Sequence, residues 1–221
     1  KNQVTDNYGT IGGGGDNQAG NNDETLDNAI YATVSGGMSN TASAYYSSIG
    51  GGGGNTASFH GSTISGGTNN TASNNYATIP GGKYALASNY GQQAYASGSF
   101  AEVGDAQTSE YVLRGQTTDD TPINLSLDGG TRSITFRDNQ AMTMDILVIA
   151  LSDTGFMKGW HIEGVFYQNN STYYTTVFSS GTNLWSASCE KVGNTFYIEV
   201  TGASGKTIRW VATVRTAEVS W

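Results

Sequence analysis

The sequence predicts an all-β protein in which a parallel β-solenoid precedes an antiparallel β-sandwich or jelly roll. Three observations support this fold class. Gly, Ser, Thr, Asn and Tyr dominate the 221 residues, whereas the helix-favouring residues Leu, Glu and Lys are scarce. The first half of the chain repeats with a period of 15 residues. The second half alternates apolar and polar residues between turn signals.

The composition also excludes several classes of protein. The net charge is −8, and no cluster of Lys and Arg is present to neutralise phosphates, so we expect no nucleic-acid partner. A single Cys excludes a disulfide scaffold, and the sequence shows no cluster of Cys and His residues to hold a structural zinc. No apolar run approaches the roughly 20 residues of a membrane helix, so no membrane insertion is predicted. No secretory leader is visible, and we expect the chain to be a fragment of a longer protein.

The composition changes near residue 107, which predicts a domain boundary. Most of the 31 glycines precede this point, and all four tryptophans follow it. A sharp shift of this kind separates domains. We therefore expect a repeat domain over 1–107 and a second domain over 108–221, joined by a neck near 104–109.

The repeat domain contains several columns of residues spaced by 15 positions. They are the β-branched column Val34, Ile49, Ile64 and Ile79, the Ala column Ala42, Ala57, Ala72 and Ala87, the Asn column Asn40, Asn55 and Asn70, and the Gly pairs 36–37, 51–52, 66–67 and 81–82. An earlier copy begins at Ile11, and an acidic insertion of eight residues, 21–28, separates it from the next copy.

A 15-residue period suits one solenoid coil made of two short strands and two tight turns. We expect the β-branched residue and the Ala to face inward, the Gly pair to supply a positive φ at a corner, and the Asn residues to form a ladder. Burial of one β-branched residue and one Ala per coil contributes less free energy than the loss of backbone entropy on ordering 15 residues costs. We therefore predict that the chain forms a closed ring of identical subunits, in which neighbouring chains bury additional surface. The candidates for the surface between chains are Tyr31, Tyr45, Tyr46, Phe59 and Tyr76.

The repeats carry a family resemblance. The segments YATVSGG from Tyr31 and YSSIGGG from Tyr46, each followed by NTAS, resemble the head repeats of trimeric autotransporter adhesins of the YadA type, which also occur in bacteriophage tail fibres. The segment 94–107 resembles the final head coil running into a neck. The resemblance covers about residues 8–107 and implies a parallel homotrimer of left-handed β-rolls. The chain departs from the pattern at Ala85-Leu86, which replace Asn-Thr, and at the insertion 21–28.

The second domain is predicted to form antiparallel sheets. Apolar and polar residues alternate over 141–151, 158–168, 196–201 and 208–215, and turn signals separate these segments. We expect Met142, Met144, Ile146 and Val148 to share one face of the first of these strands. Roughly eight or nine strands in about 110 residues are typical of a sandwich or jelly roll.

This second domain resembles the C-terminal knob of phage tail-fibre proteins. The resemblance rests on EYVLRG at 110–115 and GKTIRWVATVRTAEV at 205–219. Bacterial adhesins of the YadA type continue into a coiled-coil stalk and a membrane anchor, and the sequence shows neither. The resemblance therefore favours the tip of a viral fibre.

Candidate catalytic and metal-binding groups are few. His161 and Glu163 lie two apart on one predicted strand and would face the same way, with Asp145 on a neighbouring strand. We interpret these three residues as the polar outer face of a sheet and predict that the chain is not an enzyme. The acidic loop offers oxygen ligands for Ca²⁺ but lacks the spacing of a calcium loop, so no metal and no cofactor are predicted. Its carboxylates are Asp16, Asp23, Glu24 and Asp27.

For the second domain, the sequence favours carbohydrate recognition over catalysis or metal binding. Sugars bind to aromatic ring faces together with planar hydrogen-bonding groups. The hairpin 166–174 concentrates both kinds of side chain near a predicted loop tip. The candidate receptor-binding residues are Tyr167, Asn169, Asn170, Tyr173, Tyr174 and Trp185. The single thiol, Cys189, is expected to be a small core residue.

These observations lead to one functional prediction and three alternatives. We expect the tip of a bacteriophage tail fibre, located on the virion and outside the host cell, that binds a host-surface glycan or protein as a homotrimer. Three weak sites on one rigid body would bind with avidity. The alternatives are a structural trimerisation module of a fibre, the head of a bacterial trimeric adhesin on the cell surface, and a glycan-cleaving spike.

Overall fold

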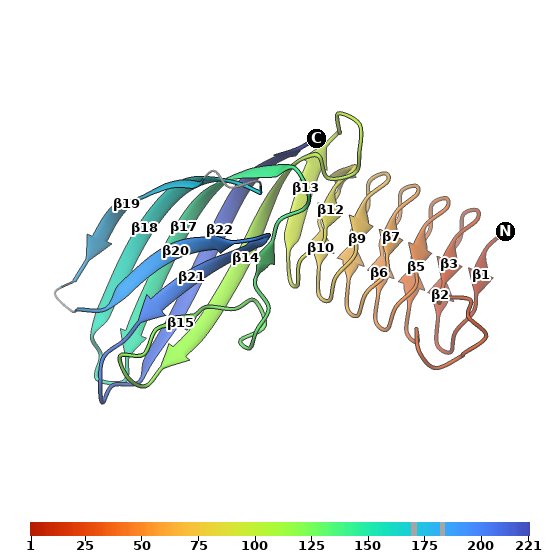
Figure 1. Cartoon of the computed structure of the whole chain (residues 1–221). Coiled ribbons are helices and arrows are strands. Elements are labelled where there is room, and N and C mark those ends of the chain that lie inside the picture. Colours follow the sequence, from red (N-terminus) through yellow and green to blue (C-terminus); the bar gives the residue numbers. More distant parts are fainter. Residues whose placement is uncertain (169–171, 182–183) are drawn as a thin grey trace. The chain divides into compact units, whose positions relative to one another are not determined.

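The computed structural model describes residues 1–168, 172–181 and 184–221, and it divides the chain into two compact units, Lys1–Ser109 and Glu110–Trp221. Within these ranges all the regular structure is β-strand (Figure 1). No helix in the described part is long and apolar enough to cross a membrane. The prediction of an all-β protein with a parallel β-solenoid, here of about six turns, is confirmed.

The first unit, called the solenoid below, consists of two parallel sheets of short strands, which are two residues long in all but one case. One sheet contains β1 (Gln3–Val4), β3 (Gln18–Ala19), β5 (Thr41–Ala42), β7 (Thr56–Ala57), β9 (Thr71–Ala72) and β12 (Leu86–Ala87). The other contains β2 (Thr10–Ile11), β4 (Thr33–Val34), β6 (Ser48–Ile49), β8 (Thr63–Ile64), β10 (Thr78–Ile79) and β13 (Gln93–Ser97), which also pairs with β11 (Gly82–Lys83).

Strand pairing in the solenoid follows the 15-residue period. Ile49 lies beside Ile64, and Ala57 lies beside Ala72. The insertion 21–28 does not disturb this register, because Thr10 still pairs with Thr33. Each coil therefore continues the sheets of the one before it (Figure 1).

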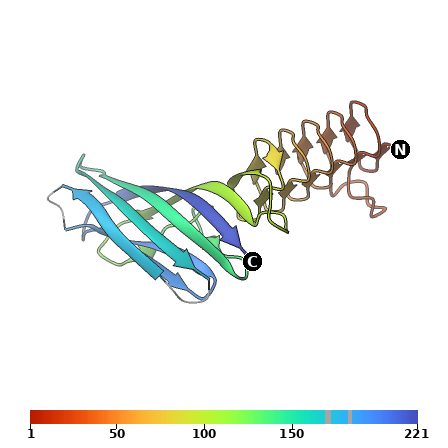
Figure 2. The ribbon, with the colours of Figure 1, turned by 90° about the horizontal axis from the view of Figure 1, so that it is seen from above.

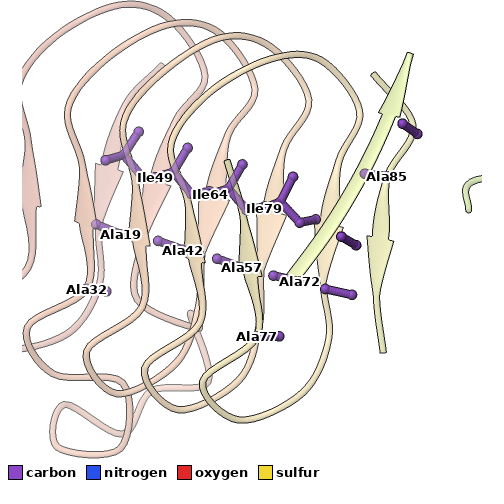
Figure 3. Close-up of a cluster of buried hydrophobic side chains, with 14 residues drawn as sticks. Ala19, Ala32, Ala42, Ile49, Ala57, Ile64, Ala72, Ala77, Ile79 and Ala85 are labelled. Atoms are coloured by element: carbon purple, nitrogen blue, oxygen red, sulfur yellow. The ribbon is translucent and has the colours of Figure 1, made fainter. Parts of the chain in front are cut away.

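The core of the solenoid is the pair of apolar columns that the sequence predicts. Figure 3 shows Ile49, Ile64 and Ile79 in one row and Ala42, Ala57 and Ala72 in a second row beside it. All six side chains are fully buried. A further small buried residue from the turn completes these coils, Ala32 and Ala77 in two of them and Ser47 and Ser62 in the two between. Small residues allow the two sheets to approach closely, so the core stays narrow.

The predicted Asn ladder and glycine corners are both present. The Asn55 amide nitrogen donates to the carbonyls of Gly51 and Gly67 at 3.0 and 2.9 Å, and its oxygen accepts from the backbone N–H of Asn70 at 3.0 Å. Gly67 has a φ of +92°, and a Cβ there would lie 2.1 Å from the carbonyl oxygen of Gly82. Asn and Gly thus tie each corner to the next coil.

The Asn ladder ends at Ala85, but the last Asn side chain, that of Asn70, keeps its hydrogen-bond partner. The backbone N–H of Ala85 still donates to the Asn70 side chain at 2.9 Å. Ala85 has no side-chain amide to continue the ladder, and Gln107 bonds both the N–H and the carbonyl of Leu86, each at 2.9 Å. The side chain of Gln107 therefore supplies side-chain hydrogen bonds to the backbone at the point where the repeat sequence changes.

An exposed column of aromatic side chains runs along the solenoid. Tyr8 and Tyr31 stack with ring centroids 5.0 Å apart, and Tyr31 and Tyr46 stack at 5.1 Å. His60 continues the column by stacking on Tyr45 at 5.3 Å. These rings form a continuous series of stacked and edge-on contacts, in which Tyr8, Tyr31 and Tyr46 are exposed. That they form the surface between chains stays a prediction.

The second unit, called the β-sheet unit below, contains a long antiparallel sheet and a small one. The long sheet has the order β19 (Thr172–Ser180), β18 (Met157–Tyr167), β17 (Gln140–Ser152), β22 (Ile208–Ser220) and β14 (Ala106–Thr117). The small sheet contains β15 (Ile123–Asn124), β16 (Ile134–Thr135), β20 (Ser186–Val192) and β21 (Thr195–Thr201), with β21 pairing with each of the others. Figure 2 shows the long strands running side by side.

The inner faces of these sheets form the core of the β-sheet unit. The alternation predicted for β17 is confirmed, since Met142, Met144, Ile146 and Val148 are buried. The two sheets meet where Phe166 packs edge-on against Phe196, with ring centroids 4.9 Å apart, and where Trp185 contacts Trp210 at 6.2 Å. Cys189 is buried, as predicted. The handedness of the solenoid, the trimer and the classification of this unit as a sandwich stay predictions.

Candidate functional site

The exposed face of the long sheet carries a row of charged side chains. Asp145 on β17 lies directly opposite Glu163 on β18 and opposite Arg215 on β22. This face is defined by the residues that alternate with the buried core positions, so the same pattern that buries Met144 and Ile146 exposes Asp145. The sheet therefore fixes the spacing of the three charges.

His161 joins this row to form a cluster of three potential ligand groups. Its Nε2 lies 2.6 Å from Oδ1 of Asp145 and 3.5 Å from Oε1 of Glu163. Arg215 turns to the other side, where its Nε lies 3.0 Å from Oε1 of Glu110. The sequence-based expectation that His161 and Glu163 face the same way, beside Asp145, is confirmed. All of these side chains are at least partly exposed.

A groove of about 700 Å³ lies over this part of the sheet. Its residues come from β17, β18, β19 and β22, and they are Thr143, Met144, Asp145, Glu163, Gly164, Val165, Tyr173, Tyr174, Thr175, Arg215, Thr216 and Ala217. This volume lies within the range of small-molecule sites, about 300–1,000 Å³. Carboxylates, a guanidinium, hydroxyls and aromatic rings thus surround one concave surface, which we call the outer-face groove.

Gly164 allows the aromatic residues beside the groove to pack. A Cβ at this position would lie 2.5 Å from the Phe166 ring and 2.8 Å from the Cβ of Tyr174. Because Gly164 has no side chain, the ring of Tyr174 stacks on Phe166 with centroids 6.2 Å apart. Tyr173 pairs with Val165 on the exposed side of the same sheet. Both tyrosines nevertheless reach solvent, since Tyr173 is 76% and Tyr174 46% exposed.

Four of the six sequence-predicted receptor-binding residues lie in the described part of the chain, and these four do not all line the groove. Tyr173 and Tyr174 line the groove, whereas Tyr167, at the end of β18, does not. Trp185 lies in the core, 3% exposed, so its ring is covered by protein and is not a platform for a ligand. Asn169 and Asn170 lie outside the described residues.

Sequence reasoning missed Arg215, Thr143 and Thr175 as residues of the groove. The alternation in 208–215 placed Arg215 on the polar face, which is correct. No feature of the sequence shows that β22 pairs with β17, however, because the two strands are far apart along the chain. The pairing of distant strands is what assembles the groove.

A smaller groove of about 330 Å³ lies on the same face beside His161. It is lined mainly by apolar side chains, including Leu147, Ile149, Phe178 and Val211. The exposed face therefore has a charged part and an apolar part, and His161 lies between them.

The acidic loop of the solenoid is organised by its own hydrogen bonds. The Asp23 carboxylate accepts from the side chain of Asn28 at 2.6 Å and from the backbone of Thr25 at 2.9 Å. The hydrogen bond from Asn28 is the main cause that lowers the pKa of Asp23. Asp27 accepts from Asn7 at 2.7 Å. These contacts stabilise the loop from within the chain.

No protein-family model and no curated protein matches the chain. Three solved structures with some likeness are bacteriophage tailspikes. The tailspike protein of Acinetobacter phage vB_ApiP_P1 is 10% identical with a TM-score of 0.32, over 86% of this chain and 45% of that chain. The tailspike protein gp49 of Acinetobacter baumannii bacteriophage Fri1 is 8% identical with a TM-score of 0.30, over 84% of this chain and 36% of that chain.

The third is the tailspike protein of Acinetobacter baumannii phage AM24, 8% identical with a TM-score of 0.28, over 100% of this chain and 50% of that chain. The chain thus spans half or less of each tailspike. At these TM-scores the likeness carries no argument about mechanism, and the proposals below rest on the chain's own residues.

One expectation is corrected by these matches. The Fri1 protein is described as a capsular polysaccharide depolymerase, which is an enzyme. The prediction that the chain is not an enzyme assumed that Asp145, His161 and Glu163 form a solvent-exposed sheet face without a catalytic role. This finding contradicts the prediction, and it is withdrawn.

Proposed function

We propose that this chain is part of a bacteriophage tail fibre or tailspike and that its outer-face groove binds a host-surface polysaccharide. The observation that carries the proposal is the groove itself, which combines the Tyr173 ring with Asp145, Glu163 and Arg215 on one concave surface. Aromatic faces stack on the C–H faces of sugars, and paired charged groups bind their hydroxyls.

The solenoid supports the same proposal by a different route. Its repeats resemble head repeats that occur in tail fibres and adhesins. Parallel strands that are hydrogen-bonded from coil to coil make a rigid element, which suits a part that holds a binding unit away from the virion. The second unit would then be a β-sandwich knob that presents the groove.

The proposed assembly is a homotrimer of left-handed β-rolls. The argument is the thin core of each coil together with the exposed aromatic column, in which Tyr8, Tyr31, Tyr46 and Tyr76 remain 41–71% exposed. Burial of these rings against neighbouring copies would add apolar area that a single solenoid lacks. A trimer would also present three grooves at once.

The proposal is tested by measuring polysaccharide binding of the purified chain on a glycan array and on a panel of bacterial capsular polysaccharides. We expect at least one polysaccharide to bind and Tyr173→Ala to weaken it about tenfold, the loss of roughly 1.4 kcal/mol of stacking. Tyr197→Ala, on the small sheet, is the matched control and should leave binding unchanged.

Two results would contradict the proposal. One is the absence of binding across the whole panel by a folded protein, which would favour the structural module. The other is an equal effect of the two tyrosine variants. Release of reducing ends from a bound polysaccharide would separate cleavage from binding.

A further inference from the structure

The cluster of Asp145, His161 and Glu163 has the composition of a metal site. Each residue offers one ligand atom, and the three atoms lie within 4.8 Å of one another. They come from β17 and β18, whose strands pair in continuous register from Ala141 to Leu151. A rigid two-stranded element therefore holds one imidazole nitrogen and two carboxylate oxygens around a common point.

The electrostatics of the cluster favour a cation. Asp145 and Glu163 are directly opposed across the strands, and like charges in such a pair destabilise a sheet. The neighbouring cation, Arg215, has its Nε at Glu110 on the far side of Asp145. The imidazole of His161 is the group that lies between the two carboxylates.

The distances fit a small ion after one local change. Bonds of about 2.1 Å in tetrahedral geometry place two ligands roughly 3.4 Å apart. The distance from His161 Nε2 to Glu163 Oε1, 3.5 Å, already matches this value. The distance from Nε2 to Asp145 Oδ1, 2.6 Å, is that of a hydrogen bond, so the ion must displace the shared proton and widen this contact. The Asp145 side chain is 49% exposed and has room to move.

We propose that Asp145, His161 and Glu163 bind one divalent transition-metal ion of the Zn²⁺ class. One imidazole nitrogen with carboxylate oxygens suits Zn²⁺, Co²⁺ and Mn²⁺, whereas Ca²⁺ takes oxygen ligands alone. Three protein ligands leave at least one coordination position for water or another ligand. Because Asp145 and Glu163 line the outer-face groove, the bound ion lies beside it. The inference does not depend on the proposed function, since it concerns binding of the ion alone.

The experiment is a calorimetric titration of the full chain with ZnCl₂, repeated with CoCl₂ and followed by the visible absorption of bound Co²⁺. We expect one ion per chain. His161→Ala should weaken binding by more than about tenfold, because even outer-shell groups at metal sites contribute 10- to 100-fold. Asp145→Asn and Glu163→Gln should each weaken it in the same direction.

The chain offers a matched control, because it contains two histidines. His60→Ala removes the histidine of the aromatic column and should leave the affinity unchanged. The proposal is overturned by an affinity that His161→Ala changes less than twofold, by loss of binding in His60→Ala, or by no saturable binding to the parent chain. Circular dichroism of each variant checks folding, and a rise in the unfolding temperature of the parent on adding ZnCl₂ gives a second readout.

Discussion

At the scale of single residues, the solenoid depends on amide side chains as well as on apolar ones. Each Asn of the ladder is buried and bonded to its own coil and to its neighbours. Each ladder amide donates to carbonyls of the glycine corners, and its oxygen accepts from the backbone N–H of the next coil, as Asn55 does with Gly51, Gly67 and Asn70. A buried polar group that loses its partner costs about 1–3 kcal/mol. The ladder therefore pairs the buried Asn amides with backbone groups from coil to coil.

Asn55→Ala should lower the free energy of unfolding by at least about 2 kcal/mol. The variant removes the amide that bonds Gly51 and Gly67 and the oxygen that accepts from Asn70. Urea unfolding followed by circular dichroism measures the change. Ser65→Ala, at an exposed position of the solenoid, is the control and should stay within about 0.5 kcal/mol of the parent. Equal stability of the two variants would contradict the account of the ladder.

Cys189 should react slowly in the folded protein. Burial raises the pKa of its thiol to about 12, so very little thiolate forms at neutral pH. We expect slow alkylation by iodoacetamide at pH 8 and fast alkylation in urea. Rapid reaction of the native thiol would show that β20 opens easily.

The same shift has a consequence for stability. The folded pKa lies above the unfolded value of about 8.5, so the contribution of the thiol is fully present below pH 8.5 and is lost as pH rises toward 12. Cys189→Ala should remove this part of the alkaline destabilisation, which pH-dependent urea unfolding measures.

At the scale of elements, the glycine corners decide whether one coil can follow another. Gly66 and Gly67 are adjacent, yet their environments differ. Gly67 has a positive φ, and a Cβ there would meet the carbonyl of Gly82, whereas a Cβ at Gly66 would meet nothing within 4 Å. The pair provides a test within one corner.

Gly67→Ala should destabilise the solenoid by more than about 2 kcal/mol, because it adds a left-handed strain and a clash with backbone. Gly66→Ala should be neutral or stabilising by up to about 1 kcal/mol, since it restricts the unfolded chain. Thermal unfolding of both variants measures the difference. A neutral Gly67→Ala would mean that the corner relaxes freely.

The sequence predicted the solenoid better than the outer-face groove, and the reason is the range of the contacts. In the solenoid, Ile49 meets Ile64 because the period itself sets the neighbours. In the β-sheet unit, Asp145 meets Arg215 only because β17 pairs with β22, and a slip of one residue would move every side chain to the other face. Alternation predicted which face each residue occupies, but not which strands lie together. Trp185 shows the limit, since it was a candidate receptor-binding residue and lies in the core.

At the scale of the whole molecule, the proposed trimer predicts a mass near three times 23.2 kDa by light scattering. Tyr46→Ala should reduce the trimer fraction, because Tyr46 stacks on Tyr31 in the exposed column. Val192→Ala, an exposed apolar position of the β-sheet unit, serves as the control. A folded monomer at micromolar concentration would contradict the trimer and the avidity argument with it.

The regular pairing of the coils also means that a whole repeat can be added to the gene or removed from it without changing how the remaining strands pair. Thr33 pairs with Ser48 one repeat later, so an in-frame duplication of one repeat places the same residues against the same neighbours. Each added copy lengthens the stack by about 4.8 Å, the spacing of adjacent strands. Recombination between repeats would then change the reach of the protein in fixed steps while the β-sheet unit stays unaltered. We expect natural relatives to differ in whole numbers of coils.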